Sequence, residues 1–375
     1  MPDRLLRLRE AGQSIWLDYI DRPLITSGRL ERYIAEGWLT GQTTNPTIFE
    51  KALAEGAAYD DQLASLPRGI GASEAFELIE AEDVRAACDL FAGVYESTGG
   101  EDGFVSIEVS PQQAHDVDTT VREARRLWEL VARPNVMVKV PGTAAGARAT
   151  QQLLAEGINV NVTLLFALTA YERIIQAFMG GLEARVRAGK PVDRVASVAS
   201  FFVSRVDSEV DKRLESLAAQ ATGEERSRIL GMRGKAAIAN AKLAYRLFCA
   251  ELAGARWRAL ADKGAKCQRP LWASTSTKNP EYRDVIYIEQ LIGRHTVNTM
   301  PPQTIDAFRD HGELSHSVTD GLNEAQLTLA ELESLGISMA EVTDKLLVDG
   351  LASFQKSFDQ LTAGLEKKLS SLVEA

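Results

Sequence analysis

Lys139 is the residue whose position in this sequence most strongly suggests chemistry. It lies in the apolar run 136–142, Val-Met-Val-Lys-Val-Pro-Gly, which predicts a buried strand closed by a turn. Side chains alternate along a strand, so Lys139 and Met137 share the face opposite the valines. Lysine is seldom buried, and loss of water disfavours its ammonium form, which makes the amine a possible nucleophile toward carbonyl carbons. The alternative is a lysine whose stem is buried and whose head reaches water.

Other predicted strands carry polar side chains at alternate positions in the same way. These positions are Ser106, Glu108 and Ser110 in the run 105–110, Asn159, Asn161 and Thr163 in the run 158–163, and Asp18 in the run 15–19. Alternation alone is also typical of an antiparallel sheet with one wet face. The segments between the runs argue against that sheet, because 119–130 and 144–154 have helical periodicity and are too long for hairpin turns.

The number of strands predicts the architecture that brings these groups together. The candidate strands begin near Ile15, Gly41, Phe104, Val136, Ile158, Val195, Pro270 and His295. Eight β/α units indicate an α/β fold of the (β/α)8 TIM-barrel type, in which residues at the carboxyl ends of the strands line the active site. Asp18, Glu108, Lys139, Asn161 and Thr163 would then converge. The main alternative, a doubly wound open sheet, would scatter them along an edge.

Composition excludes several classes of function. The chain has 375 residues, 45% hydrophobic and 25% charged, with a net charge of −10, which argues against nucleic acid as a partner. We expect no membrane span and no secretory leader, and hence a cytoplasmic protein. The three cysteines and four histidines have no disulfide or zinc-ligand spacing, so we expect no metal and no cofactor, although carboxylates could still bind Mg²⁺. A barrel of this size is expected to be a monomer or a homodimer.

We expect residues 1–375 to form a single barrel domain with three additions. Helical elaborations are predicted at about 50–103 and 207–264, the second as two helices over 207–228 and 235–260. A helical tail is predicted at about 317–375. It carries an apolar stripe with helical spacing, formed by Leu347, Leu351, Phe354, Phe358, Leu361 and Leu365. A stripe of this length predicts a helix docked on the barrel rather than a coiled coil or a membrane device.

Four runs of the sequence resemble the transaldolase family. They are Gln-Thr-Thr-Asn-Pro at 42–46, the strand-four lysine, Gly-Ile-Asn-Val-Asn-Val-Thr-Leu-Leu-Phe at 157–166, and Ser-Phe-Phe-Val-Ser-Arg at 200–205. Their order and spacing match from roughly residue 15 to residue 302, and the length and tail resemble the long bacterial form of these class I, Schiff-base aldolase-like enzymes. The resemblance implies transfer of a dihydroxyacetone unit between sugar phosphates in the non-oxidative pentose phosphate pathway. The donors would be sedoheptulose 7-phosphate or fructose 6-phosphate, and the acceptors glyceraldehyde 3-phosphate or erythrose 4-phosphate.

The resemblance also implies roles for individual residues. Lys139 matches the lysine that forms the Schiff base, whose protonated imine withdraws electrons far better than a ketone does. Asp18 matches the acid/base that takes the C4 hydroxyl proton. Glu108 and Thr163 match the pair that positions a water for imine formation and hydrolysis. A structural ion pair between Glu108 and Lys139 is the alternative for that carboxylate.

The remaining matches would bind substrate. Thr44, Asn45, Asn161 and Ser200 match residues around the bound three-carbon unit, and Arg205 matches a phosphate-binding arginine. Arg205 could instead belong to a solvated helix start. The sequence lacks the second arginine that other members place after strand seven. There we expect Ser274, Ser276 and Lys278 to contact the phosphate, which leaves acceptor preference open.

Two other functions fit part of the pattern. A lyase on the same scaffold, a fructose-6-phosphate aldolase-like enzyme, would release free dihydroxyacetone, but such relatives are much shorter and arrange their acid/base differently. A non-catalytic sugar-phosphate binder would need no imine-forming lysine. Dependence of turnover on an acceptor aldehyde separates transferase from lyase, and loss of activity in Lys139→Arg with retained binding separates an enzyme from a binder.

Overall fold

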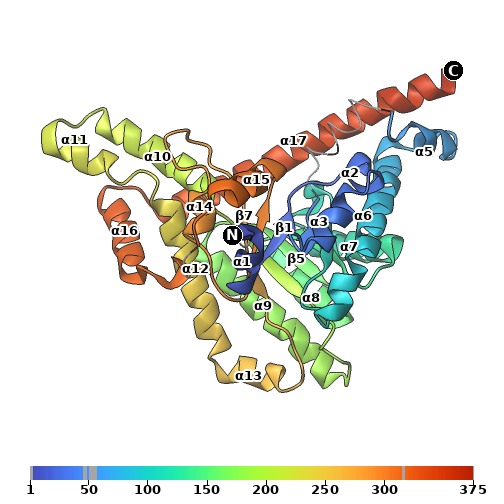
Figure 1. Cartoon of the computed structure of the whole chain (residues 1–375), viewed down its shortest axis with the longest axis horizontal. Helices are drawn as coiled ribbons and strands as arrows, with labels where there is room; N and C mark the ends of the chain where they lie inside the picture. Colours follow the sequence, from blue (N-terminus) through green and yellow to red (C-terminus); the bar gives the residue numbers. More distant parts are fainter. Residues whose placement is uncertain (1–2, 45–48, 50–56, 315–316, 375) are drawn as a thin grey trace.

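The chain folds into a closed barrel of eight parallel strands, with strand order β1 to β8 (Figure 1). The computed structural model describes residues 3–44, 49, 57–314 and 317–374. The strands are β1 (Gln13–Leu17), β2 (Gly41–Gln42), β3 (Phe104–Glu108), β4 (Val136–Pro141), β5 (Val160–Leu165), β6 (Ser197–Phe202), β7 (Arg269–Ala273) and β8 (Thr296–Met300). β1 pairs with β8 and closes the sheet, so the predicted (β/α)8 barrel is confirmed and the open doubly wound alternative is wrong.

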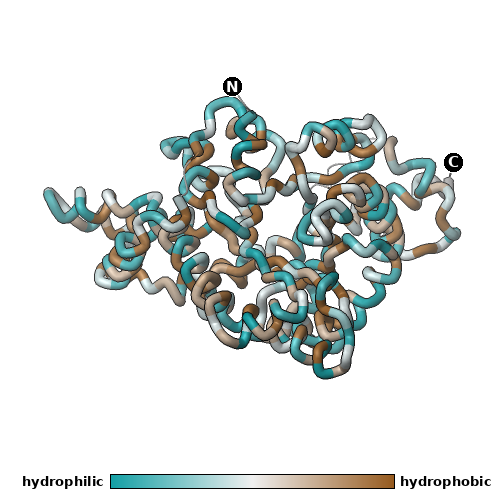
Figure 2. The backbone as a smooth tube through the Cα atoms, turned by 60° about the horizontal axis from the view of Figure 1, so that its bottom comes forward, coloured by the Kyte–Doolittle hydropathy of each residue, from teal (hydrophilic) through white to brown (hydrophobic). Residues whose placement is uncertain are grey.

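Helices connect the strands and surround the barrel. They are α1 (Arg4–Glu10), α2 (Arg22–Thr26), α3 (Arg29–Ala35), α5 (Asp60–Ser65), α6 (Ala72–Ser97), α7 (Val117–Val131), α8 (Ala144–Glu156), α9 (Leu168–Arg187), α10 (Ser204–Ala218), α11 (Gly223–Leu230), α12 (Ala236–Leu252), α13 (Ala255–Ala261), α14 (Ile286–Glu289), α15 (Pro302–His311), α16 (Leu322–Ser334) and α17 (Met339–Glu374), with 3₁₀ turns η1 (Pro111–Gln113) and η2 (Ser317–Thr319). Figure 2 shows apolar positions recurring between polar ones along these helices, as one-sided burial requires.

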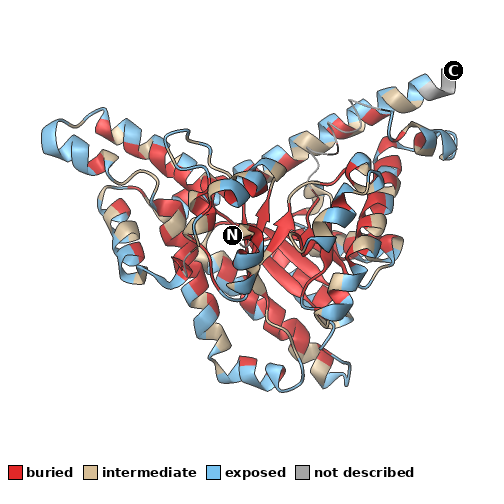
Figure 3. Ribbon diagram, in the orientation of Figure 1, coloured by how far each residue is buried: buried red, intermediate tan, exposed pale blue. Residues whose placement is uncertain are grey.

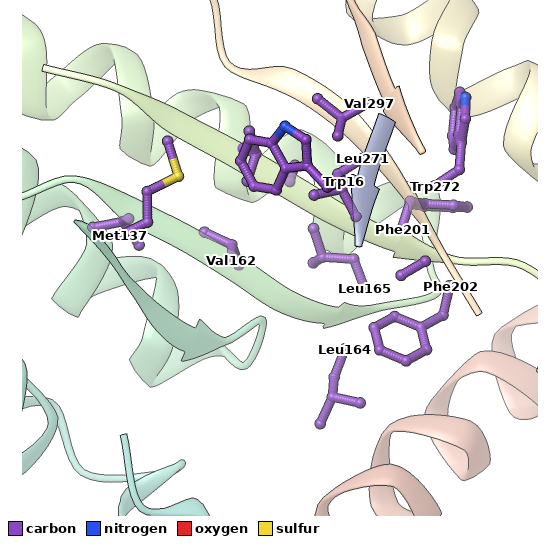
Figure 4. Packing of buried hydrophobic residues seen from close by; sticks show 14 of the residues in the cluster. Trp16, Met137, Val162, Leu164, Leu165, Phe201, Phe202, Leu271, Trp272 and Val297 are labelled. Carbon is purple, nitrogen blue, oxygen red and sulfur yellow. The ribbon is translucent and has the colours of Figure 1, made fainter. Parts of the chain in front are cut away.

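Large apolar side chains pack on both faces of the strands. Trp16 and Trp272 are fully buried, and the Trp272 ring meets the Phe201 ring edge-on at a centroid distance of 6.4 Å on the face that packs against the outer helices. Figure 4 shows these aromatic residues together with aliphatic side chains such as Val297 in one packed cluster. Most strand positions are buried on both faces, as Figure 3 shows, which is the expected environment of a parallel barrel.

Register places the polar positions of neighbouring strands at one level. Glu108 pairs with Lys139 across β3 and β4, and Lys139 pairs with Asn161 across β4 and β5. Because side chains alternate between the two faces of a strand, laterally paired residues point to the same side. The three polar side chains therefore share one face near the carboxyl ends of their strands, as the alternation predicted.

The helical elaborations differ in detail from the sequence prediction. Segment 50–103 contains α5 and α6 among its described residues, separated by a break at 66–71 as expected. Segment 207–264 holds four helices where two were predicted. Gly223, the first residue of α11, adopts a left-handed φ of +59°, and Gly254 is extended between α12 and α13. Glycine weakens a helix interior and tolerates both conformations, which explains the two breaks.

The predicted helical tail at 317–375 comprises η2, α16 and the long helix α17, which passes over the barrel and continues out past α5 (Figure 1). Phe354, Leu361 and Leu365 of the predicted stripe are buried, and Phe358 packs on Phe76 of α6. The stripe therefore docks the helix on the barrel, as the spacing indicated. In the part of the chain described, no helix is long and apolar enough to cross a membrane.

Candidate active site

Lys139 lies inside the barrel mouth with only 7% of its surface exposed. Its Nζ donates to Oε2 of Glu108 at 3.1 Å and to the carbonyl oxygen of Thr44 at 3.1 Å. The Glu108 side chain is 6% exposed, and burial raises its pKa while the charge of Lys139 opposes the rise. A buried amine beside a carboxylate has a partner that can accept its proton, which is what a lysine nucleophile needs.

A chain of polar side chains crosses the barrel interior beside this pair. The Asn161 amide donates to Oγ of Ser106 at 3.0 Å, and the Ser200 hydroxyl donates to Oδ1 of Asn161 at 2.6 Å. All three side chains are buried. Asn161 and Ser200 thus lie together next to Lys139, where the sequence placed them, and their orientation is fixed by hydrogen bonds.

Asp18 follows directly after β1, whose last residue is Leu17, rather than lying inside the strand as the run 15–19 had suggested. Its Oδ1 accepts a hydrogen bond from the Thr43 hydroxyl at 2.9 Å. Asp18 is partly exposed, yet enough protein surrounds the carboxyl that desolvation raises its pKa. The charges of Lys139, Arg205 and Lys278 and the Thr43 hydrogen bond all oppose the rise. This carboxyl therefore lies among the cations of the site.

Strand β5 is irregular where it delivers Thr163. The β5–β6 register shifts between Val162 and Leu165, and Leu164 has a left-handed φ of +59°. Such a conformation is rare for a branched residue. The Thr163 hydroxyl is buried and has no hydrogen-bond partner among the described residues. The sequence predicted the position of Thr163 but gave no sign of the irregular backbone beside it.

Two cations approach Asp18 from the loops after β6 and β7. Arg205 lies in the first turn of α10, with its guanidinium 5.1 Å from the centre of the Phe202 ring, and burial lowers its pKa. Lys278 lies on the exposed loop and donates to Oγ of Ser276 at 2.9 Å. Desolvation and the neighbouring Arg205 charge lower the Lys278 pKa, and Asp18 opposes this. Two converging cations beside a serine are suited to binding a phosphate.

Ser274 is the first residue after β7. Asn45 lies outside the described residues. Ser274 adopts a left-handed φ of +56°, and its hydroxyl is 3.0 Å from the hydroxyl of Ser204 at the start of α10. Thr44, next to Asn45, reaches the site through its carbonyl oxygen. Among the described residues, the fold therefore gathers the predicted set at one end of the barrel.

Glu80 of α6 is a site residue that sequence reasoning missed. It is 4% exposed and lies beside Glu108, Lys139 and Thr44. Desolvation, together with the Glu108 charge, raises its pKa to about 8, so it holds a proton at neutral pH. A signal existed, because Glu80 occupies the helical spacing of the buried positions Phe76 and Val84.

Phe354 of α17 is the second missed residue. Its ring centre lies 5.9 Å from Nζ of Lys139, and the side chain is 8% exposed. The stripe on the tail predicted that Phe354 would be buried, but it did not identify the surface that the residue covers.

A hollow of about 690 Å³ opens at the opposite end of the barrel, near the start of β1. Two of its charged groups are paired: Arg269 lies 3.4 Å from Asp102, which accepts a hydrogen bond from Nε1 of Trp16 at 2.8 Å. Groups at this end of a TIM barrel support stability rather than catalysis.

The fold and the groups at the carboxyl ends of the strands are typical of (β/α)8-barrel enzymes that act on carbonyl compounds through a lysine. The family model described as transaldolase/fructose-6-phosphate aldolase matches residues 15–365. The chain belongs to this family.

Curated relatives resemble the chain over almost its whole length. It is 48% identical over 371 residues to a transaldolase of Acidothermus cellulolyticus, covering 98% of each chain. It is 47% identical over 373 residues to a transaldolase of Thermobifida fusca, covering 99% of this chain and all of the relative. A transaldolase 1 of Streptomyces coelicolor is 48% identical over 369 residues, covering 98% of this chain and 95% of the relative.

Proposed function

We infer that the chain is a transaldolase, an enzyme of the non-oxidative pentose phosphate pathway. It transfers a dihydroxyacetone unit from sedoheptulose 7-phosphate or fructose 6-phosphate to glyceraldehyde 3-phosphate or erythrose 4-phosphate. The observation that carries this proposal is the buried Lys139–Glu108 pair at 3.1 Å inside a barrel of this family. The full-length similarity to curated transaldolases supports the transferase over the binder, which would need no such lysine.

In the proposed reaction, the Lys139 amine attacks the donor ketone and Glu108 accepts the proton that Nζ loses. Water leaves, and the protonated imine draws electrons from the C3–C4 bond. Asp18 takes the C4 hydroxyl proton as that bond breaks and the first aldehyde departs. The resulting enamine attacks the acceptor aldehyde. Glu108 and the Thr163 hydroxyl then position the water that hydrolyses the new imine.

Substrate binding is divided between two sets of residues in this proposal. Thr44, Asn45, Asn161 and Ser200 hold the hydroxyls of the three-carbon unit, supported by the hydrogen bond from Ser200 to Asn161. Arg205, Lys278, Ser274 and Ser276 bind the phosphate, supported by the two cations beside Asp18. Ser274, Ser276 and Lys278 stand where better-known members carry a second arginine, so acceptor preference is the property in which this chain is expected to differ from them.

The test is reduction with borohydride in the presence of fructose 6-phosphate, followed by intact mass and peptide mapping. We expect a three-carbon adduct on the peptide that contains Lys139 and none in Lys139→Arg. The mapping must separate Lys139 from Lys242, another buried lysine, which lies on α12. An adduct on Lys242, or none in a folded protein alongside an active control enzyme, would contradict the assignment.

Aldolase activity is the second candidate, because the matched family model covers both reactions. The two differ in whether turnover of the three-carbon unit requires an acceptor. Fructose 6-phosphate alone should give little free dihydroxyacetone, and erythrose 4-phosphate should restore turnover. Release at the same rate without the acceptor would make the chain an aldolase.

A further inference from the structure

The helix α17 is held to the barrel on both sides of the mouth. Near its start, Lys345 lies 3.7 Å from Glu209 of α10, and near its end Lys368 lies 2.6 Å from Asp60 of α5. Between them, the Phe358 ring meets the Phe76 ring of α6 at 6.1 Å. Since α10 follows β6 and α6 precedes β3, the middle of α17 passes over the strands that carry the site.

Gly350 marks the point of closest approach. A Cβ at this position would lie 2.9 Å from Cδ2 of Leu164 and 3.7 Å from Nη1 of Arg205. Leu164 is the residue with left-handed backbone next to Thr163, and Figure 4 shows it beside Phe202. The helix therefore touches the irregular part of β5 and the phosphate-site arginine at once.

Phe354 comes one turn later on the same face of α17. Its ring centre is 5.9 Å from the Lys139 amine, within the range of a cation–π contact, and little of the ring is exposed. A ring in this position is compatible with a cation, whether ammonium or iminium, and removes water from one side of Nζ.

We propose that Phe354 is a specificity-determining residue that sets how the three-carbon unit divides between transfer to an acceptor aldehyde and release as free dihydroxyacetone. The proposal rests on the proposed function, because it concerns the fate of the enamine on Lys139.

The two outcomes differ in whether C3 of the enamine bonds to the acceptor carbon or takes up a proton. In transfer, the enamine carbon C3 forms a bond to the acceptor carbonyl carbon, whose oxygen takes up a proton. In release, C3 takes a proton instead, which leaves the iminium of dihydroxyacetone. In both outcomes one water then adds at C2, the C–N bond breaks, and the amine and the ketone are recovered. Excluding water from the enamine removes a proton source for C3, so it slows release while leaving carbon–carbon bond formation possible.

The experiment compares Phe354→Leu and Phe354→Ala with the same substitutions at Phe358, which docks the same helix on α6 and lies one turn further along. Fructose 6-phosphate is supplied with and without erythrose 4-phosphate, and sedoheptulose 7-phosphate and free dihydroxyacetone are measured. We expect the ratio of release to transfer to rise several-fold in Phe354→Ala and less in Phe354→Leu. It should stay near the wild-type value in both Phe358 variants.

The Leu variant keeps most of the apolar volume, so it tests the proposal even if the Ala variant fails to fold. Equal loss of both activities with an unchanged ratio, or the same rise in the Phe358 variants, would show that Phe354 only holds the helix. The wild type is measured in the same assay. A wild type that transfers nothing would overturn the proposed function, whereas an unchanged ratio in an active enzyme overturns only the role of Phe354.

Discussion

At the scale of single residues, the site combines one buried amine with three carboxyl groups. Asp18, Glu108 and Glu80 all interact electrostatically with Lys139, and burial raises the pKa of each carboxyl. Asp18 lies among three cations, whereas Glu108 and Glu80 share Lys139, and one lysine does not neutralise two buried carboxylates. Glu80, whose pKa is raised to about 8, is the group that keeps its proton.

Replacing Lys139 by Ala should lower turnover at least about a thousandfold, because no other group replaces a lost nucleophile. The measurement is kcat with fructose 6-phosphate and erythrose 4-phosphate, alongside circular dichroism to verify the fold. Near-normal turnover in a folded Lys139→Ala protein would exclude the Schiff-base mechanism at this residue.

Replacing Glu80 by Gln should change how stability depends on pH. The folded pKa of about 8 lies above the ordinary value of 4.5, so the folded state holds the proton longer than the unfolded state. Wild-type stability must then fall as pH rises from about 4.5 to about 8, and level off above that. Glu80→Gln lacks this titration, so it should gain roughly 3–4 kcal/mol over wild type between pH 5 and pH 8.

Urea unfolding at these two pH values measures the effect. Glu74→Gln, an exposed position on the same helix, is the matched control and should follow wild type. Parallel pH curves for wild type and Glu80→Gln would mean that Glu80 is ionised in the folded protein.

Replacing Arg205 by Ala should weaken phosphate binding. A hydrogen bond between charged groups contributes about 1.5–3 kcal/mol, so KM for fructose 6-phosphate should rise about 10- to 100-fold. KM for unphosphorylated fructose should change little. Lys212→Ala, exposed on the same helix, is the control. An equal rise for both sugars would remove Arg205 from the phosphate site.

At the scale of elements, the site depends on three helices that lie outside the sheet. α6 supplies Glu80, the first turn of α10 supplies Arg205, and α17 supplies Phe354.

The turn after β4 is sterically constrained, because a Cβ at Gly146 would meet the Pro141 carbonyl oxygen at 1.8 Å. Thr143 caps α8 by accepting a hydrogen bond from the Gly146 amide at 2.9 Å. That turn is therefore a tight strand-to-helix connection.

Replacing Gly350 by Val should displace α17 from the barrel. The new Cβ would overlap Leu164, and overpacking of this kind costs about 1–3 kcal/mol. We expect a lower urea midpoint together with loss of transfer activity, because the helix carries Phe354. Gly364→Val is the matched control, since a Cβ there has open space around it on the same helix. Equal effects of the two substitutions would mean that the helix propensity of valine, and not contact with Leu164, causes the loss.

At the scale of the whole molecule, the barrel and its helical additions share one core. Buried residues of α10, α12 and α17, such as Val210, Ala241 and Leu361, belong to the same apolar cluster as the strands. Asp207 of α10 also ties two other helices, by accepting hydrogen bonds from the Ala237 amide of α12 and the Tyr287 hydroxyl of α14 at 2.8 Å each. These contacts favour a single domain for the chain.

We therefore expect one cooperative unfolding transition. Far-UV circular dichroism, which reports all helices, and the fluorescence of the tryptophans, of which Trp16 and Trp272 are fully buried on the strands, should give the same urea midpoint. A separate early loss of helical signal would show that the additions unfold independently. Sedimentation of the same sample would decide between the monomer and the homodimer that the sequence left open.

What the sequence determined by itself is the barrel and the groups on its strands. Polar residues alternating with β-branched ones place Glu108, Lys139 and Asn161 on one face, because the two-residue period of a strand is a local property. The eight-fold recurrence of such strands between helical segments then gave the fold. The motif at 157–166 gave the family in the same way, since it lies within one strand and its flanks.

The tertiary structure alone decided which outer elements complete the site. Glu80 and Phe354 appear in the sequence as members of helical stripes, and a stripe shows that a side chain is buried without showing against what. Their approach to Lys139 depends on how α6 and α17 dock across residues far apart in the chain. Arg205 and Lys278 differ from these two, because the resemblance had already assigned both to the phosphate, and the fold brings them together from the first turn of α10 and the loop after β7.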